Sequence, residues 1–343
     1  MSDKTLQVVQ GLVLGPDGKP SVASGTAGDV MRRLIQCNMD VSCLRTNDIL
    51  GDKDWEIIDT VVLEHARRRQ VAVAELMRRN LVFRFSDGLS ATVLEYVDMG
   101  VIGDATVSMS PRVRGDKSQI NYVPRYMPLP LTFMDWDIDV RTLGASRRAG
   151  RPLDTTWAGR AADRVGEATE NMLFNGSYTF TVESGVIYGL CDHPSRQPYH
   201  LTAAWDASGA NPVRDVRLMK QLAVNAGFYG PYGVWTSGGY DVVLDDDYVR
   251  ASTNNTAKTV RQRLLELRGI EFVQPCDFMP ANTVVLVQLT PDVIRMVEGM
   301  PLQNLQWKTE GDLVLNMKVM QILVPQIRAD QDGNCGVIHG HLA

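Results

Sequence analysis

One long amphipathic helix near the middle of the chain most limits what this sequence can fold into. The pattern predicts a helix from about Asp154 to Phe174, with one apolar stripe along its length. Asp154 suits its start, and Asn175-Gly176 suits its end because glycine favours the position just past a helix. Such a stripe must pack on another layer, so the fold needs a sheet or a second helix beside it. The stripe consists of Leu153, Trp157, Ala161, Val165, Ala168 and Met172.

A second amphipathic helix is predicted from about Asp54 to Asn80. Three consecutive arginines, Arg67, Arg68 and Arg69, lie in its middle. An arginine-rich helix face can contact phosphates, but an ionic face toward solvent or another subunit is more common.

The first 50 residues are weakly patterned. A short helix is predicted from Val30 to Leu44, with Arg32 and Arg33 away from its apolar side. A segment of this length with so little core signal is typical of an arm that lies on another subunit.

Between the two helices, the sequence predicts strands and a long loop. Residues 81–96 read as a β-hairpin, since Asp87-Gly88 suits a type I′ turn between two β-prone runs. Residues 98–126 read as an extended loop, and 127–140 as a strand with edge-type prolines. Two basic clusters lie in this part of the chain. One is in the extended loop (Arg112, Arg114 and Lys117), and the other is in the turn after the strand (Arg147, Arg148 and Arg151).

The second half of the chain alternates helices and strands, which is typical of an α+β or α/β unit. Short strands are expected at 178–182 and 186–188. The predicted order thereafter is helix 213–226, strand 232–236, helix or loop 240–252, helix 259–267, strands 271–273 and 283–289, helix 291–298, strand-rich 312–325, and a closing strand near 336–339.

Composition excludes several classes of protein. The formal net charge of −5 excludes a globally basic nucleic-acid binder, although it leaves room for a local basic face. Five cysteines at scattered positions do not form a disulfide framework and fit a reducing compartment. The sequence has no apolar run long enough to span a bilayer and does not begin like a signal peptide, so we expect a soluble cytoplasmic protein.

The familiar catalytic and cofactor motifs are absent from the sequence. Cys335, His339 and His341 would share one face of a strand and carry zinc-type ligand atoms, which leaves a metal-dependent hydrolase as the weakest alternative. We interpret three other groups as structural: Cys191, His193 and His200 as loop residues, Asp245–Asp247 as a solvated charge run, and Gly227–Gly233 as a helix-to-strand connection. We expect no catalytic residue, metal or cofactor.

The order of these elements resembles the Hong Kong 97-type major capsid protein of tailed bacteriophages, in the branch that also builds encapsulin nanocompartments. The resemblance covers about residues 53–340 and rests on order and spacing. It is carried by these segments: Trp55-Glu-Ile-Ile-Asp59, Pro128-Leu-Pro-Leu-Thr-Phe133, Arg148-Ala-Gly-Arg-Pro-Leu-Asp154, Asn171-x-x-Phe-Asn-Gly176, Gly185-Val-Ile-Tyr-Gly-Leu190, Gln306-Trp-Lys308, and Pro325-x-Ile-Arg328 before Gly336-Val-Ile-His339.

The resemblance implies a division of the chain into parts. They are an N-terminal arm (1–52), a helix and hairpin (53–97), an extended loop reaching a neighbour (98–126), a peripheral domain with a spine helix (127–199), an axial α/β domain (200–305) and a return to the peripheral domain (306–343). The expected assembly interface comprises the basic clusters named above (Arg32, Arg33, Arg67, Arg68, Arg69, Arg112, Arg114, Lys117, Arg147, Arg148 and Arg151) together with Trp157.

The resemblance further implies a structural subunit, not an enzyme. Its copies would form the pentamers and hexamers of an icosahedral or prolate head, around double-stranded DNA that is packed without sequence specificity. Portal, scaffolding and decoration proteins would be its partners, with assembly in the host cytoplasm and no membrane. Members of this fold can cross-link a loop lysine, for which Lys117 is placed, to a neighbour's asparagine. An encapsulin-type compartment for cargo enzymes is the alternative, and the long arm favours the viral capsid.

Overall fold

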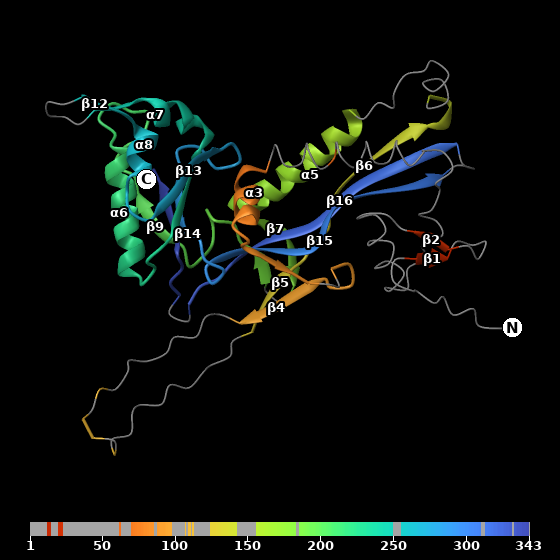
Figure 1. The fold of residues 1–343 in the computed structure, drawn as a ribbon, viewed down its shortest axis with the longest axis horizontal. Coiled ribbons are helices and arrows are strands. Elements are labelled where there is room, and N and C mark those ends of the chain that lie inside the picture. The colour runs from red at the N-terminus through yellow and green to blue at the C-terminus, as the bar shows by residue number, and fades with distance from the viewer. Residues whose placement is uncertain are drawn as a thin grey trace.

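The computed structural model places two lobes side by side, a rounded α/β lobe and an elongated lobe built on a long β-hairpin (Figure 1). The structure describes residues 12–14, 20–22, 62, 70–85, 88–97, 107, 109–110, 112, 124–142, 156–182, 185–249, 255–309, 313–330 and 333–342. Within these residues, no helix is both long enough and apolar enough to cross a membrane.

The α/β lobe is organised around a five-stranded mixed sheet in the order β13-β10-β14-β17-β9. β10 runs parallel to β13 and antiparallel to β14, and every residue of β10 is buried. The strands are β9 (Gln197–His200), β10 (Tyr232–Ser237), β13 (Ile270–Cys276), β14 (Val284–Gln288) and β17 (Val337–His341). The central strands are rich in valine, which suits a sheet covered on its faces.

Helices α6 (Pro212–Asn225) and α8 (Val260–Leu265) begin at side-chain caps that the sequence supplies locally. Asn211 accepts the backbone N–H of Arg214, and Pro212 occupies the first helical turn. Thr259 and Gln262 form a reciprocal capping box at α8. Caps of this kind stabilise a helix by about 1 kcal/mol each. The lobe also contains η2 (Gly238–Tyr240), α7 (Asp241–Asp245) and the ladder β11 (Asp247–Val249) to β12 (Asn255–Thr259).

The elongated lobe contains a four-stranded sheet in the order β3-β15-β16-β6. β15 (Ile294–Thr309) and β16 (Val314–Ile327) form the long antiparallel hairpin, and β6 (Thr132–Asp139) pairs with β16 along its whole length. Helix α5 (Thr156–Asn175) lies along this sheet (Figure 1) and buries three alanines and a valine against it: Ala158, Ala161, Ala162 and Val165. It ends at Gly176, whose φ of 67° is the left-handed conformation that glycine adopts readily.

Three short antiparallel ladders complete the described fold. β4 (Val93–Val97) pairs with β5 (Pro124–Pro128), β7 (Ser177–Val182) pairs with β8 (Gly185–Ile187), and β1 (Leu12–Leu14) pairs with β2 (Pro20–Val22). β4 and β5 bracket the segment predicted as an extended loop, so the two ends of that segment lie side by side. Apart from β1 and β2, the N-terminal arm lies outside the described residues, as does most of the loop.

The two lobes share one hydrophobic core. The largest cluster fills the α/β sheet and continues into α3 (Val71–Arg78) and the C-terminal end of α5. Phe174 of α5 lies edge-on to Trp235 of β10, with ring centroids 6.0 Å apart. Two smaller clusters lie between α5 and the long hairpin and between the hairpin and the β4–β5 ladder.

Most predicted elements are confirmed. Helix α5 confirms the helix predicted over 154–174. The α/β elements follow the predicted order up to β14. As predicted, Gly227–Gly233 connects a helix to a strand. The helix expected from 54 to 80 is confirmed at Val62 and over α3, but it is not continuous. Gln70 has non-helical dihedral angles just before α3, and Asn80 has a φ of 58° past its end; residues 54–61 and 63–69 lie outside the described residues.

The predicted hairpin over 81–96 is wrong. β3 (Val82–Arg84) runs parallel to β15, whereas β4 pairs with β5, so the two β-prone runs join different sheets. Gly88 is required for a different reason from a hairpin turn, since a Cβ on it would lie 2.0 Å from the carbonyl oxygen of Gly299. The glycine allows close approach of two backbone segments.

The predicted helix over 291–298 is also wrong, because β15 begins at Ile294. Residues Met296–Glu298 lie between β3 on one side and β16 on the other, and the run is buried on both faces. Continuous burial removes the alternation that distinguishes a strand from a helix in sequence. The C-terminal strand β17 joins the five-stranded sheet, so a boundary of the α/β domain at residue 305 leaves β17 apart from the sheet it completes.

Candidate assembly surfaces

The joint between the lobes is built around helix α3, which is fastened to α5 by a buried carboxylate. Glu170 of α5 accepts the backbone N–H groups of Ala72, at 2.6 Å, and Val73, at 3.1 Å. The thiol of Cys276, at the end of β13, lies 3.5 Å from the same carboxylate. Burial raises the pKa of Glu170, although the two backbone hydrogen bonds oppose that shift. Glu170 therefore holds the first turn of α3 against the spine helix.

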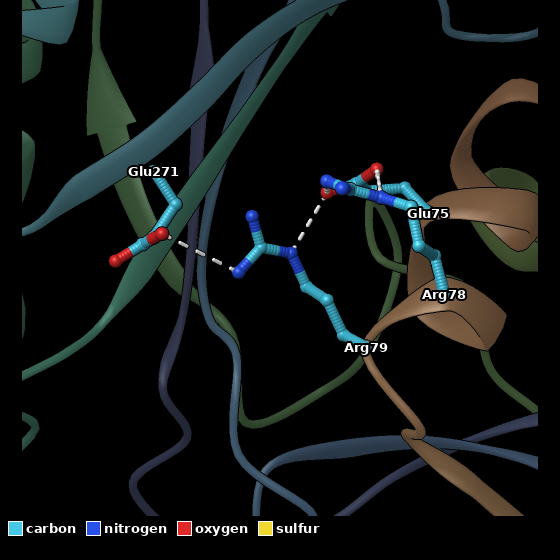
Figure 2. Close-up of polar contacts among 4 residues, drawn as sticks. All are labelled: Glu75, Arg78, Arg79 and Glu271. Atoms are coloured by element: carbon cyan, nitrogen blue, oxygen red, sulfur yellow. Dashed lines mark hydrogen bonds and ion pairs between the residues drawn. The ribbon is translucent and has the colours of Figure 1, made fainter.

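The other end of α3 is fastened to the α/β lobe by ion pairs (Figure 2). Glu75 receives hydrogen bonds from Arg78 and Arg79, and Arg79 continues to Glu271 of β13 at 3.6 Å. The guanidinium of Arg79 also lies over the ring of Phe272, 5.1 Å from its centroid. The pKa of Glu75 is lowered, chiefly by its hydrogen bond from Arg78. Helix α3 thus connects the spine helix to the edge of the five-stranded sheet.

The outer end of the elongated lobe exposes several large apolar side chains, two of which have a cation over one ring face: Lys318 over Phe133 and Arg160 over Trp157. β6 is the last strand of its sheet, so its outer edge has no described strand partner, and none of its eight residues is buried. Phe133 and Met134 project from opposite faces of this strand and are about half exposed. Leu313, at the tip of the long hairpin, and Trp157, at the start of α5, are 66% and 57% exposed. Long open edges of this kind are templates for pairing with another chain.

The base of the extended loop borders a cavity of about 280 Å³. Its walls come from β4, β5, β8 and the turn at residues 188–195, and they include Tyr96, Arg125, Tyr126 and Tyr188. Tyr178 of β7 donates a hydrogen bond to Asp192 and packs edge-on to Tyr188, which in turn packs edge-on to His193. Burial and Asp192 raise the pKa of Tyr178 to about 12, so this phenol stays protonated at neutral pH.

The proposed metal-ligand set is not assembled in the structure. Cys335 precedes β17, and its thiol lies 3.3 Å from the carbonyl oxygen of Arg328. Burial raises the pKa of this thiol to about 12, which keeps it protonated and a poor ligand. His339 and His341 do share a face of β17, with rings stacked 5.1 Å apart. Among the described residues, no group of three His, Cys, Asp or Glu side chains is arranged to hold a metal ion.

The other candidate groups have structural surroundings. His200 lies in β9 with its ring 4.8 Å from that of His341, whereas Cys191 and His193 lie in the turns between β8 and β9. In the acidic run, Asp245 pairs with Arg261, which also pairs with Asp241.

Two of the twelve residues expected at the assembly interface are described. Arg112 is exposed, with its backbone N–H 3.4 Å from the hydroxyl of Ser110, and Trp157 is exposed beside the guanidinium of Arg160. The structure does not bring these two residues together into one described surface. The following residues lie outside the described part of the chain: Arg32, Arg33, Arg67, Arg68, Arg69, Arg114, Lys117, Arg147, Arg148 and Arg151.

Of the exposed apolar side chains at the outer end, the sequence analysis predicted Trp157 and missed Phe133, Met134 and Leu313, because the other residues it chose were basic. The run Thr132–Asp139 carried a usable signal, since Phe133 and Met134 are adjacent large apolar residues in a strand that then alternates with aspartates. Adjacent residues of a strand point to opposite faces, so one of these two large apolar side chains lies on the face away from the spine helix.

Comparison with known proteins identifies the family and the fold. A family model described as "Family of unknown function (DUF6260)" matches residues 45–340. A virus-like particle from Pyrococcus furiosus is 18% identical, with a TM-score of 0.58 over 83% of this chain and 98% of that chain. The capsid of Myoviridae phage XM1 is 11% identical, with a TM-score of 0.57 over 78% and 91%, and the capsid of a native GTA particle is 14% identical, with 0.56 over 78% and 90%. The fold is therefore the Hong Kong 97-like α+β capsid fold that the sequence led us to expect.

Proposed function

The chain belongs to the DUF6260 family, and we propose that it is a structural subunit whose copies assemble into the capsid shell of a tailed bacteriophage. The observation that carries the proposal is the match to capsid chains over most of both partners, for example 78% of this chain and 91% of the phage XM1 chain. Its role is structural and not enzymatic, and the genome inside is double-stranded DNA packed without sequence specificity.

The surface of the elongated lobe supports an assembling subunit. β6 has no described strand partner on its outer edge and exposes two large apolar side chains, which a second copy of the chain would cover, beside the acidic residues Asp135, Asp137 and Asp139. Contacts of different surfaces between neighbouring copies close into rings when the rotation between copies permits. We assign the α/β lobe to the axial domain, with β9 and β17 included in it, and the spine helix and long hairpin to the peripheral domain.

An encapsulin-type compartment that sequesters cargo enzymes is the second candidate. The similarity to the Pyrococcus furiosus virus-like particle favours it, because that match covers 98% of the other chain. If the chain is a viral capsid subunit, its copies form pentamers and hexamers. A portal and separate scaffolding or decoration proteins are then its partners, and the virion assembles in the host cytoplasm. Lys117, the loop lysine in a suitable place for a cross-link, lies outside the described residues, and we propose no cross-link through it.

Electron microscopy of the expressed full-length chain tests the proposal. Shells of uniform subunit spacing are expected, and co-expression with the flanking phage genes should give particles that contain a portal and protect DNA from nuclease. Uniform small shells filled with a co-expressed protein and free of DNA would favour the compartment. A chain that stays monomeric at every concentration would refute both.

A further inference from the structure

Helix α6 presents a basic face that is unpartnered in the described structure. Arg214, Arg217, Leu218 and Gln221 are exposed and fall on one side of the helix by their spacing, and Leu218 is 40% exposed. No described residue forms an ion pair with either arginine. The helix lies along the side of the α/β lobe that is farthest from the long hairpin (Figure 1).

The acidic residue of the same helix is turned inward. Asp215 is buried, where it accepts hydrogen bonds from the indole N–H of Trp205, at 3.0 Å, and from the hydroxyl of Tyr199, at 3.1 Å. The charge of Asp215 is thus used inside the lobe and does not balance the two outer arginines. The outer face of α6 is consequently positive around an apolar centre.

A second face of the same lobe has the opposite character. Helix α7 lies across the top of the lobe in Figure 1 and exposes Val242, which is 75% exposed. Four carboxylates surround this valine in the chain, and Arg261 is the described cation that pairs with them. This segment therefore has more carboxylates than described cations paired with them, close in the chain to an exposed valine; the carboxylates belong to Asp241, Asp245, Asp246 and Asp247.

We infer that the α6 face of one copy binds the α7 face of the next copy, so that the α/β lobes join head to tail. The inference rests on the proposed function and names the contact that orders neighbouring lobes. The two faces are complementary: α6 exposes Leu218 beside two arginines, and α7 exposes Val242 beside aspartates. Because the two faces are different surfaces of one lobe, the contact repeats around a ring. Charge complementarity of this kind fixes register and excludes wrong partners.

Packaged DNA is the competing partner for a basic helix face. The exposed side of α6 carries Leu218 beside its two arginines and no aromatic side chain on which a base could stack. DNA also leaves the exposed Val242 and its carboxylates unexplained, whereas a second copy accounts for both faces together.

The test uses two full-length charge-reversal variants, R214E/R217E and D246K/D247K. Asp246 and Asp247 are chosen because Asp241 and Asp245 already pair with Arg261 inside the subunit. Each variant alone presents like charges across the contact, so each should need at least about tenfold more protein to assemble. A 1:1 mixture of the two should recover assembly into even-numbered rings, because each α6 face then meets an oppositely charged α7 face. The matched control, R214K/R217K, keeps both charges and should assemble like the wild-type chain.

Ring size is read by native mass spectrometry and electron microscopy, after melting temperatures show that the variants fold like the wild type. Assembly of R214E/R217E at the wild-type concentration would overturn the inference, as would a mixture of folded variants that stays unassembled. Normal R214E/R217E shells that have lost DNA would assign the α6 face to DNA instead. In each of these results the wild type still forms shells, whereas failure of the proposed function itself would appear as a monomeric wild-type chain.

Discussion

Two strands of similar length show how differently the lobes are built. β10, at the centre of the α/β sheet, buries all six of its residues, whereas β6, at the edge of the long sheet, buries none of its eight. β10 has a strand on each side and touches the spine helix through Trp235. β6 has one described neighbour and exposes Phe133 and Met134.

The difference separates the part of the molecule that stabilises the fold from the part that is left for neighbours. The α/β lobe, α3 and the end of α5 share one continuous core, so they form the stable body of the subunit. The outer part of the long hairpin packs through two smaller hydrophobic clusters, one against α5 and one against the β4–β5 ladder. Substitutions in the two regions should therefore act on different observables.

The largest effect on stability is expected from Trp235→Ala. Trp235 is fully buried and contacts Phe174 of the spine helix and Phe272 of β13, so its removal leaves a cavity in the core that joins the lobes. The free energy of unfolding should fall by about 3–5 kcal/mol. Urea unfolding followed by near- and far-ultraviolet circular dichroism should show one shifted transition. A loss restricted to part of the signal would mean that the lobes unfold separately.

A pH-dependent loss of stability is expected from His339. Burial, with help from Arg196 and His341, lowers the pKa of His339 to about 4 from an ordinary value of 6.5. Between pH 6.5 and 4 the unfolded chain therefore binds a proton that the folded chain does not, so stability falls as pH falls. The slope from this group is at most about 1.4 kcal/mol per pH unit. Urea unfolding of His339→Asn between pH 7.5 and 5 should lack this part of the slope, and an unchanged slope would contradict the assignment.

A smaller effect is expected at the joint, where Arg79 pairs with Glu271. Glu271→Ala should cost less than about 1 kcal/mol, since its side chain is 47% exposed. Arg79→Ala should cost more, about 1–2 kcal/mol, because Arg79 also pairs with Glu75 and lies over Phe272. A double-mutant cycle in urea unfolding separates the pair from these other contacts. Equal losses for the two variants would show that the other contacts of Arg79 contribute nothing.

The smallest effect on folding, and a large effect on assembly, is expected at the outer end. Phe133→Ser with Leu313→Ser should reduce the free energy of unfolding by about 1 kcal/mol or less, because Leu313 is largely exposed and Phe133 is half exposed with Lys318 over its ring. Assembly should nevertheless fail or need more protein, as measured by sedimentation velocity. Val319→Ser is the matched control. Its side chain is fully buried in the same lobe, so this substitution should lower the free energy of unfolding more than the exposed-site variant does. Normal assembly of the exposed-site variant would remove this surface from the interface.

Local elements were predictable because their signals are local. The spine helix was found within two residues at its start and one at its end, since its stripe and Gly176 are all contained in the segment. Pairing was not predictable in the same way. Asp87-Gly88 suggested a hairpin, but Gly88 meets Gly299, more than two hundred residues away. The buried run at 294–298 could not be assigned to a strand, because continuous burial hides its period.

The candidate surfaces also contain some residues that the sequence could indicate and others that it could not. Charge clusters are visible in sequence, and they directed the search to arginines, of which Arg112 is the one in the described residues. The joint at Glu170 and Glu75 was not found, because both carboxylates sit in ordinary helical patterns. Their role depends on what α3 packs against, which sequence alone does not contain.

By itself the sequence determined the class of elements and their order, because helix periodicity, caps and apolar runs are properties of neighbouring residues. Only the tertiary structure decided which strands pair, which faces are covered, and which carboxylates are buried. Those outcomes depend on contacts between segments far apart in the chain, as where β17 returns to the sheet of β14 and where β6 is left at an edge. The surfaces left uncovered by that arrangement, at β6, α6 and α7, are the ones that a second copy of the chain would complete.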